Sequence, residues 1–556
     1  MKLLKSTKII LFIILTSVYC LSVSGFTPSN ELKDKFETSL EKAFQFSSIE
    51  GDLPDWVGMD PDKDGYEGTR AAAFYEYIKT LNPVPQRSDV IVAVIDSGFD
   101  IEHPDLKANI WKNEKEINGA PGVDDDNNGY SDDFHGWNFL GKEHYLALEV
   151  AREYKRLKKL KTPESNEYFI KVKNEYDDKK DENNAIKIGV LQTLEDIYDA
   201  EKILKEKNIT TDPRKLQEIS NKLPEGKVSD AASMILGVYM LYGADKKDLE
   251  ELKESYEIKS KYLFDTTDTY SLAGDNPELL LETNYGNNDV TEKKEEHGTH
   301  VSGIIASVKT GQAPFVKIMC LRAVPNEGDE RDKDVGNAIR YAVDNGASII
   351  NMSAGKYYSP DPEFVVDAIK YAEGKGVLFV VPGGNDGDDI SGIVNYPRKY
   401  IPESGGKKYF SNMIVVGASS WMKKWSQEKD PENFNVKYDL AAPFSNYSKE
   451  VIDIFAPGVK INSTVPNGEY KKIDGTSMAA PVVSGIAAVL KAYYPELNAE
   501  QLKDVILSSV RKYDGLMVKV KGSNSKVLFS NLSKSGGVVD MLNAFKKAAE
   551  MKSLKN

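Results

Sequence analysis

The stretch Gly475-Thr-Ser-Met-Ala-Ala-Pro481 places a serine immediately before a long apolar run, Met478 to Leu490. The glycine permits a sharp turn, and the apolar run predicts a buried helix that begins next to Ser477. The first turn of a helix leaves backbone N–H groups unpaired and carries a partial positive charge, which stabilises negative charge beside a nucleophile. Ser477 is therefore a candidate nucleophile, although serine is also an ordinary N-cap residue.

A serine hydroxyl is a weak nucleophile at neutral pH and needs a base. The candidate base is His297, in Glu296-His-Gly-Thr-His-Val-Ser-Gly-Ile-Ile-Ala306, where the following glycine allows close approach of the backbone. His300 lies three residues further on and could share a metal with His297 on one helical face. The string lacks the glutamate of a His-Glu-x-x-His zinc protease, so we expect His300 to be a packed, hydrogen-bonded helix residue.

A group that orients the base is available in Asp89-Val-Ile-Val-Ala-Val-Ile-Asp-Ser-Gly98. The short aliphatic run predicts a strand that is buried on both faces of a parallel sheet. Asp96 then lies at the carboxyl end of that strand, where open α/β sheets carry their sites. The alternative is that Asp96 is a cap or turn residue before Gly98.

Asp96, His297 and Ser477 follow one another in the order found in subtilisin. The three strings that contain them resemble the signatures of the subtilase family of serine endopeptidases. The resemblance implies an α/β, subtilisin-like three-layer fold with a mostly parallel sheet flanked by helices. It also implies that Ser477 attacks the substrate, His297 accepts the proton and Asp96 orients the imidazole.

Two further segments resemble the supporting parts of a subtilase site. Phe379-Val-Val-Pro-Gly-Gly-Asn-Asp-Gly387 is similar to the loop that carries the asparagine of the oxyanion hole, here Asn385. The alternative is that these residues form an ordinary Asn-Asp-Gly turn without a catalytic role. Asn351-Met-Ser-Ala-Gly355 is similar to the segment that pairs with extended substrate. The resemblance implies substrate contacts at Ser353, Ala354, Gly355, Pro382, Gly383 and Gly384. Because many relatives carry small alanines at the positions of Pro382 and Gly383, the pocket preference stays open.

An acidic stretch is the best candidate for a metal site. In Gly122-Val-Asp-Asp-Asp-Asn-Asn-Gly-Tyr-Ser-Asp-Asp133, oxygen-bearing side chains alternate ahead of Gly129, as in the first half of an EF-hand loop. The twelfth position is His135, so a complete EF-hand is excluded. We expect a structural Ca²⁺, with a solvated acidic turn as the alternative, and its candidate ligands are Asp124, Asp126, Asn128 and Asp132. The resemblance also implies a calcium ligand at Asp105, in His103-Pro-Asp-Leu106, which matches a position that ligates calcium in many subtilases; a helix-start or turn carboxylate is the equally favoured alternative.

The first residues have the pattern of a secretory signal peptide, with three early lysines, the apolar run Ile9–Leu15 and a small-residue cleavage site near Ser24. The apolar run is too short to span a bilayer comfortably. We expect residues 1–24 to be removed, the protein to be secreted or to reach the periplasm or cell envelope, and the mature chain to contain no transmembrane span. Lipid attachment at Cys20 is less favoured because bulky Tyr19 precedes it. Cys320 is expected in a buried strand.

Organisation along the chain is uneven. Residues 25–86 contain amphipathic patterns near Glu31–Phe44 and Thr69–Leu81 and are either an N-terminal arm or a short propeptide. The catalytic domain is predicted in two parts, 87–141 and 290–548, because strand and helix patterns alternate from Val301 to Leu490. Residues 142–289 are rich in Lys and Glu and predict a mostly helical insertion of unknown partner on a surface loop.

The net charge of −14 comes without a basic stripe, so we expect protein or peptide substrates and no nucleic acid. The sequence predicts a secreted serine endopeptidase that works through an acyl-enzyme. Resolution of the acyl-enzyme by an amine would make a peptide ligase, and the sequence does not separate the two. The alternatives from other classes are a catalytically silent relative that binds peptide and a helical adhesion protein organised by the insertion.

Overall fold

The computed structural model describes residues 53–242, 244–266, 273–277, 279–283, 285–424, 439–521 and 525–553. It divides into two compact units. The larger unit contains Asp52–Glu149 and Thr267–Asn556, and the smaller one contains Val150–Thr266. The predicted signal peptide and the predicted helix near Glu31–Phe44 lie outside the described residues.

The larger unit is built on a nine-stranded sheet in which every neighbouring pair of strands is parallel except the last. The strand order is β2 (Gly136–Asn138), β3 (Lys317–Arg322), β1 (Ile91–Asp96), β4 (Ile349–Met352), β5 (Leu378–Pro382), β8 (Met413–Ser419), β9 (Ile454–Pro457), β15 (Gly537–Val538) and β12 (Arg511–Lys512). Only β12 runs antiparallel to its neighbour. Two-stranded ribbons are formed by β6 (Tyr400–Glu403) with β7 (Gly406–Tyr409), β10 (Ile461–Val465) with β11 (Glu469–Ile473), and β13 (Met517–Val518) with β14 (Val527–Leu528).

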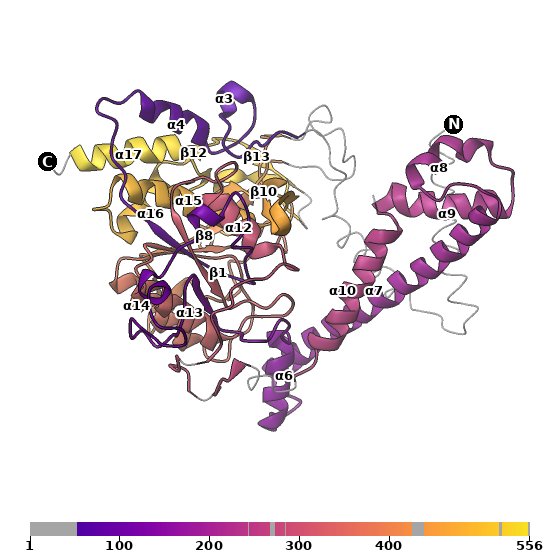
Figure 1. Cartoon of the computed structure of the whole chain (residues 1–556), viewed down its shortest axis with the longest axis horizontal. Coiled ribbons are helices and arrows are strands. Elements are labelled where there is room, and N and C mark those ends of the chain that lie inside the picture. Colours follow the sequence, from indigo (N-terminus) through magenta and orange to yellow (C-terminus); the bar gives the residue numbers. More distant parts are fainter. Residues whose placement is uncertain are drawn as a thin grey trace. The chain divides into compact units, whose positions relative to one another are not determined.

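Helices cover both faces of this sheet (Figure 1). One face carries α4 (Ala71–Lys79), α12 (His297–Ala306), α15 (Thr476–Tyr493), α16 (Ala499–Ser508) and α17 (Met541–Ser553). The other face carries α13 (Asp332–Asp344) and α14 (Pro362–Gly374). Short helical turns lie at α3 (Pro61–Asp64), η1 (Lys107–Asn109), α5 (Glu114–Ile117), η3 (Pro466–Gly468) and η4 (Phe529–Asn531). The predicted three-layer α/β fold is confirmed.

The two layers of core follow from the alternation of side chains along each strand. In β1, Val92 and Val94 pack into the core shared with α12 and α15, whereas Ala93 and Ile95 pack into the core shared with α13 and α14. All four side chains are fully buried. The strand therefore reads as a continuous apolar run in the sequence because both of its faces are covered.

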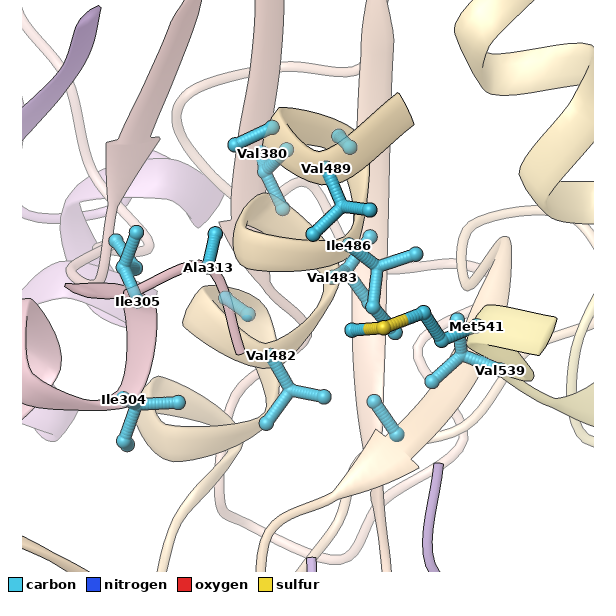
Figure 2. Packing of buried hydrophobic residues seen from close by; sticks show 14 of the residues in the cluster. Ile304, Ile305, Ala313, Val380, Val482, Val483, Ile486, Val489, Val539 and Met541 are labelled. Carbon is cyan, nitrogen blue, oxygen red and sulfur yellow. The ribbon is translucent and has the colours of Figure 1, made fainter. Parts of the chain in front are cut away.

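Helix α15 is the centre of the first core. Figure 2 shows Val482 of this helix on the side of Ile304 of α12, and Val483 and Ile486 beside Met541 and Val539. Within the described residues, α15 is the helix that is long and apolar enough to cross a membrane, but 89% of it is buried inside the fold. Its apolar character is explained by that burial, and it gives no evidence of a membrane span.

The segment before β1 belongs to the same core. Trp56 and Phe74 are completely buried in the cluster that contains α15 and α17. The Trp56 indole N–H donates to the carbonyl of Val459 over 3.1 Å, and Arg70 forms an ion pair with Asp540 at 3.2 Å. Residues 53–81 are thus joined to the sheet domain by packing and by polar contacts.

The smaller unit is helical and has its own apolar clusters, centred on Val190 and Leu204. It consists of α6 (Glu149–Lys159, whose first residue belongs to the larger unit), α7 (Glu167–Glu206), α8 (Pro213–Ile219), the turn η2 (Ser220–Lys222), α9 (Lys227–Tyr242) and α10 (Lys246–Tyr262). It is narrower than the predicted insertion, 142–289. Residues next to β2 account for much of the difference: Tyr285 is buried in the sheet domain, and its carbonyl accepts a hydrogen bond from the Trp137 indole.

Candidate active site

Asp96 and His297 meet at the carboxyl edge of the sheet. Asp96 is the last residue of β1, and His297 is the first residue of α12. Nδ1 of His297 donates to Oδ1 of Asp96 over 2.8 Å. Gly298 makes this approach possible, because a Cβ at that position would lie 2.2 Å from the carbonyl oxygen of Gly98 and 3.2 Å from Oδ1 of Asp96.

The surroundings of His297 control its charge and its tautomer. Burial lowers the pKa of His297, but the negative charge of Asp96 and the hydrogen bond to it outweigh burial and hold the pKa above the ordinary 6.5. Glu295 acts in the same direction, and its Oε1 accepts the backbone N–H of His297 at 3.2 Å. Since the carboxylate holds the proton at Nδ1, the neutral imidazole is left with Nε2 as its acceptor.

Ser477 is the second residue of α15, as the apolar run predicted. Its Oγ donates to the backbone carbonyl of Ser353 over 3.2 Å. In a regular helix the carbonyl of Ser477 would accept from the N–H of residue 481, but Pro481 has none. The hydroxyl of Ser353 donates to that carbonyl instead, over 2.9 Å. Ser353 thus replaces the backbone donor that Pro481 lacks.

A short series of buried hydrogen bonds continues from Ser353. Nδ2 of Asn351 donates to Oγ of Ser353 over 3.0 Å, and Oγ of Ser484 donates to Oδ1 of Asn351 over 2.8 Å. The series joins the end of β4 to two turns of α15. Ser353, predicted only as a substrate contact, is therefore also a support of the serine itself.

Asn385 lies on the exposed loop after β5 and is held by Thr476. The backbone N–H of Thr476 donates to Oδ1 of Asn385 over 2.9 Å, and the Thr476 hydroxyl donates to the same oxygen over 2.8 Å. Because both partners are donors, the oxygen must face them, and the NH₂ group points the other way. Thr476 was missed from the sequence, although it stands inside the string that pointed to Ser477.

A cavity of about 370 Å³ opens beside these residues. Ser477 and Asn385 line it, together with five of the six predicted substrate contacts, Ser353, Ala354, Gly355, Pro382 and Gly384. Gly383 has another place: a Cβ there would lie 2.5 Å from Cδ1 of Ile452, so its small size serves packing on the side of Ile452. Both predicted substrate segments therefore meet at one cavity.

His300 lies beside the site but has a structural role. It is completely buried, and its Nε2 lies 3.0 Å from the carbonyl oxygens of Ile461 and Lys471. Two acceptors require a proton on Nε2, and burial lowers the pKa of His300 to about 3. The imidazole is thus a neutral donor that ties α12 to the β10–β11 ribbon, which agrees with the expectation of a packed helix residue.

Part of the predicted calcium site comes together in the structure. Ligand oxygens of Asp124, Asp126 and Glu116 all lie within 4.8 Å of one another. Oδ1 of Asp132 is a buried oxygen without a hydrogen-bond partner among the described residues, while its Oδ2 accepts the N–H of Gly122. An all-oxygen set of this kind fits Ca²⁺. Glu116 was not predicted because it lies before the acidic stretch and is not part of its alternation of oxygen-bearing side chains.

The other two predicted ligands, Asn128 and Asp105, are not among the three residues whose ligand oxygens lie within 4.8 Å of one another. Nδ2 of Asn128 donates to Asp133 over 2.9 Å and its Oδ1 accepts the N–H of Tyr130, so both ends of the amide are engaged within the turn. Oδ2 of Asp105 accepts from Ser307, Tyr470 and the N–H of Lys309. Asp105 therefore fixes the end of α12 and takes no part in the acidic cluster.

Comparison with known proteins identifies the family. The family model described as "Subtilase family" matches residues 87–529, which is more than half of the chain. The chain belongs to the subtilase family. This confirms the resemblance of the three strings around Asp96, His297 and Ser477.

This subtilase is 36% identical over 200 residues to the thermophilic serine proteinase of Bacillus sp. (strain AK1), which covers 35% of the chain and 42% of that protein. It is 35% identical over 227 residues to the major intracellular serine protease of Bacillus subtilis (strain 168). This alignment covers 39% of the chain and 62% of that protein. The crystal structure of a cold adapted subtilisin-like serine proteinase aligns at 26% identity over 43% of this chain and 76% of that one, with a TM-score of 0.33. The chain spans about half the length of the two sequence relatives.

Proposed function

We propose that this subtilase is a serine endopeptidase that hydrolyses peptide bonds through an acyl-enzyme. The observation that carries the proposal is the hydrogen bond between Asp96 and His297 at the sheet edge where Ser477 and Asn385 line one cavity. The strands that lead to Asp96, Ser353 and Asn385 are parallel neighbours, so their carboxyl ends deliver these residues to the same edge.

The proposed reaction assigns one task to each residue. Oγ of Ser477 leaves the carbonyl of Ser353 and attacks the substrate carbonyl carbon, while its proton passes to Nε2 of His297. The oxygen that becomes negative accepts from Nδ2 of Asn385 and from the backbone N–H of Ser477. His297 then protonates the leaving amine, and water attacks the acyl-enzyme with His297 again as the base.

The first test is covalent labelling by a fluorophosphonate probe. We expect the wild type to be labelled and Ser477→Ala to be unlabelled. Ser391→Ala is the matched control, because Ser391 is an exposed serine on the loop that follows Asn385, and it should be labelled like the wild type. A folded wild type that is neither labelled nor able to cleave casein would favour the alternative, a catalytically silent relative that binds peptide.

We propose in addition that Glu116, Asp124, Asp126 and Asp132 hold a structural Ca²⁺. The ion would neutralise an acidic turn and stabilise the folded state by mass action, about 2.7 kcal/mol at a hundredfold excess over the dissociation constant. The test is the thermal midpoint in Ca²⁺ minus that in EDTA. Asp126→Asn should abolish the difference, whereas Asp105→Asn should keep it; equal differences in both variants would refute the assignment.

We also propose that the protein is exported with cleavage after residue 24. The basic and apolar pattern of the first residues supports this proposal. N-terminal sequencing of protein from the medium and from the cell envelope is the test. A lipid on Cys20 would appear as an envelope-bound form whose mature chain begins at that cysteine.

A further inference from the structure

The cavity beside Ser477 contains two lysines that have no donor left for a ligand. Nζ of Lys356 contacts Glu149 at 2.7 Å, Asp332 at 2.9 Å and the carbonyl of Glu330 at 2.8 Å. An ammonium group has three N–H donors, so these three acceptors use all of them. Both charged partners of Lys356 are themselves buried.

Lys399 is saturated in the same way. Its Nζ donates to Asp453 over 2.7 Å, to the carbonyl of Val451 over 2.8 Å and to the carbonyl of Glu450 over 3.2 Å. The Lys399 side chain is only 4% exposed. Neither lysine therefore has a free N–H to donate to an acidic side chain that enters the cavity. Each lysine is also paired with at least one buried carboxylate.

The remaining charged residues of the lining are acidic: Asp329, Glu330 and Asp386. Asp386 directly follows Asn385 and is exposed. Its Oδ2 accepts from the Tyr357 hydroxyl and from Nδ2 of Asn446, so both contacts hold one oxygen and Oδ1 is directed away from them. Burial raises the pKa of Glu330 to about 7, so Glu330 adds negative charge above neutral pH.

Lining residues and the direct partners of the two lysines together supply six carboxyl groups against two ammonium groups. Lys521, whose Nζ donates to the backbone carbonyl of Asp386, adds a third ammonium group, so carboxyl groups remain in excess. The Tyr357 ring forms part of the same wall, and an aromatic face attracts a cation. The rings of Tyr396 and Tyr400 already have Arg398 and Lys407 over them, at 5.7 and 4.6 Å. We propose that this cavity selects substrates with a basic side chain, Lys or Arg, on the residue whose carbonyl Ser477 attacks. The selection rests on the proposed function, because Ser477 lines the cavity that would hold this side chain.

The experiment uses quenched peptides that are identical except at this residue, which is Arg, Lys, citrulline, norleucine or Glu, assayed at pH 8. Citrulline keeps the shape of Arg and removes its charge. We expect kcat/KM for Arg to exceed that for citrulline at least about tenfold, and the ratio to fall with added salt. Asp386→Asn should lower the ratio up to about fivefold, the range of an exposed ion pair.

Asp389→Asn is the matched control, since Asp389 is an exposed aspartate of the same loop outside the cavity lining and should leave the ratio unchanged. Glu330→Gln is a second variant that should lower the ratio without changing the size of the side chain. Equal cleavage of the Arg, citrulline and norleucine peptides by an enzyme that the fluorophosphonate labels would overturn the preference and leave the proposed function intact. Absence of both labelling and cleavage would remove the proposed function and the preference with it.

Discussion

Replacing Trp56 by Phe should slow the reaction of Ser477, although Trp56 lies 421 positions earlier in the chain. The indole N–H of Trp56 donates to the carbonyl of Val459. On either side of Val459, the carbonyl of Gly458 accepts the N–H of Gly475 over 2.8 Å, and the N–H of Lys460 donates to Asp474 over 2.5 Å. Gly475 is the N-cap residue directly before α15, so the chain of contacts runs from Trp56 to the turn that carries Ser477.

The magnitude follows from what the substitution removes. Phe keeps an aromatic ring but leaves the Val459 carbonyl without its donor, and an unsatisfied buried group costs about 1–3 kcal/mol. If segment 458–460 relaxes to recover that energy, Gly475 and Ser477 move with it. A displacement near 1 Å at a reacting group costs up to about 10²-fold in rate. We therefore expect fluorophosphonate labelling of Trp56→Phe to be about 10- to 10²-fold slower, in a protein that remains folded.

Trp137→Phe provides the matched control. Trp137 is also buried, and its indole N–H also donates to a backbone carbonyl, that of Tyr285 at 2.9 Å, but it lies in β2 and in the core on the other face of the sheet. Both variants should lower the thermal midpoint by similar amounts, and only Trp56→Phe should slow labelling. Equal labelling rates for the two variants and the wild type, measured well below both midpoints, would refute the link between residues 53–81 and Ser477.

Three further outcomes follow from the site. The pKa of His297 is raised and the imidazole must be neutral to accept a proton, so kcat/KM should rise with pH through that pKa; Asp96→Asn should move this limb to lower pH while slowing the reaction at every pH. Asn385→Ala should lower kcat by about 10²–10³, the loss known for the equivalent donor of subtilisin, with little change in KM. Gly298→Ala should strongly impair activity because its Cβ meets the Gly98 carbonyl at 2.2 Å, whereas Gly374→Ala, with nothing within 4 Å, should be harmless in the same labelling and melting assays.

The residues that could be predicted from sequence are those whose local string reports their position. Asp96 follows an unbroken aliphatic strand, and Ser477 stands between a glycine and an apolar helix. The neighbouring residues in the sequence therefore predict the position of each residue in the fold. The pairing of Asp96 with His297 could be expected only because the order of the strings resembled a family. The alternation of strands and helices after Val301 was sufficient for the sheet and its layers.

What could not be predicted depends on contacts between distant segments. Thr476 donates to Asn385, and Lys399 donates to Asp453. Both contacts join residues that are far apart in the sequence and that no local pattern relates. The hydrogen bonds inside the acidic turn could not be predicted either: Asn128 bonds to Tyr130 and Asp133, and both carboxylate oxygens of Asp124 accept backbone N–H groups. The compact helical unit, residues 150–266, is shorter than the predicted insertion, 142–289, and a Lys- and Glu-rich segment can still contribute single residues such as Tyr285 to the core of the sheet domain.

A long insertion does not disturb the pairing of Asp96 with His297, because backbone hydrogen bonds of the sheet domain hold together the chain segments on either side of the insertion. The N–H of Phe99 donates to the carbonyl of Val290 over 3.1 Å, and Asn138 and Asn287 exchange two backbone hydrogen bonds of 2.8 and 3.0 Å. These contacts bring together the chain on both sides of residues 150–266 near Asp96 and His297. Loop-closure entropy grows only logarithmically, by about 0.6 kcal/mol for each doubling of length. A helical unit with its own apolar clusters can therefore be added between Asp96 and His297 at small cost to stability. The geometry of this pair depends on the strands that carry it and on Gly298, and not on how many residues separate the two side chains.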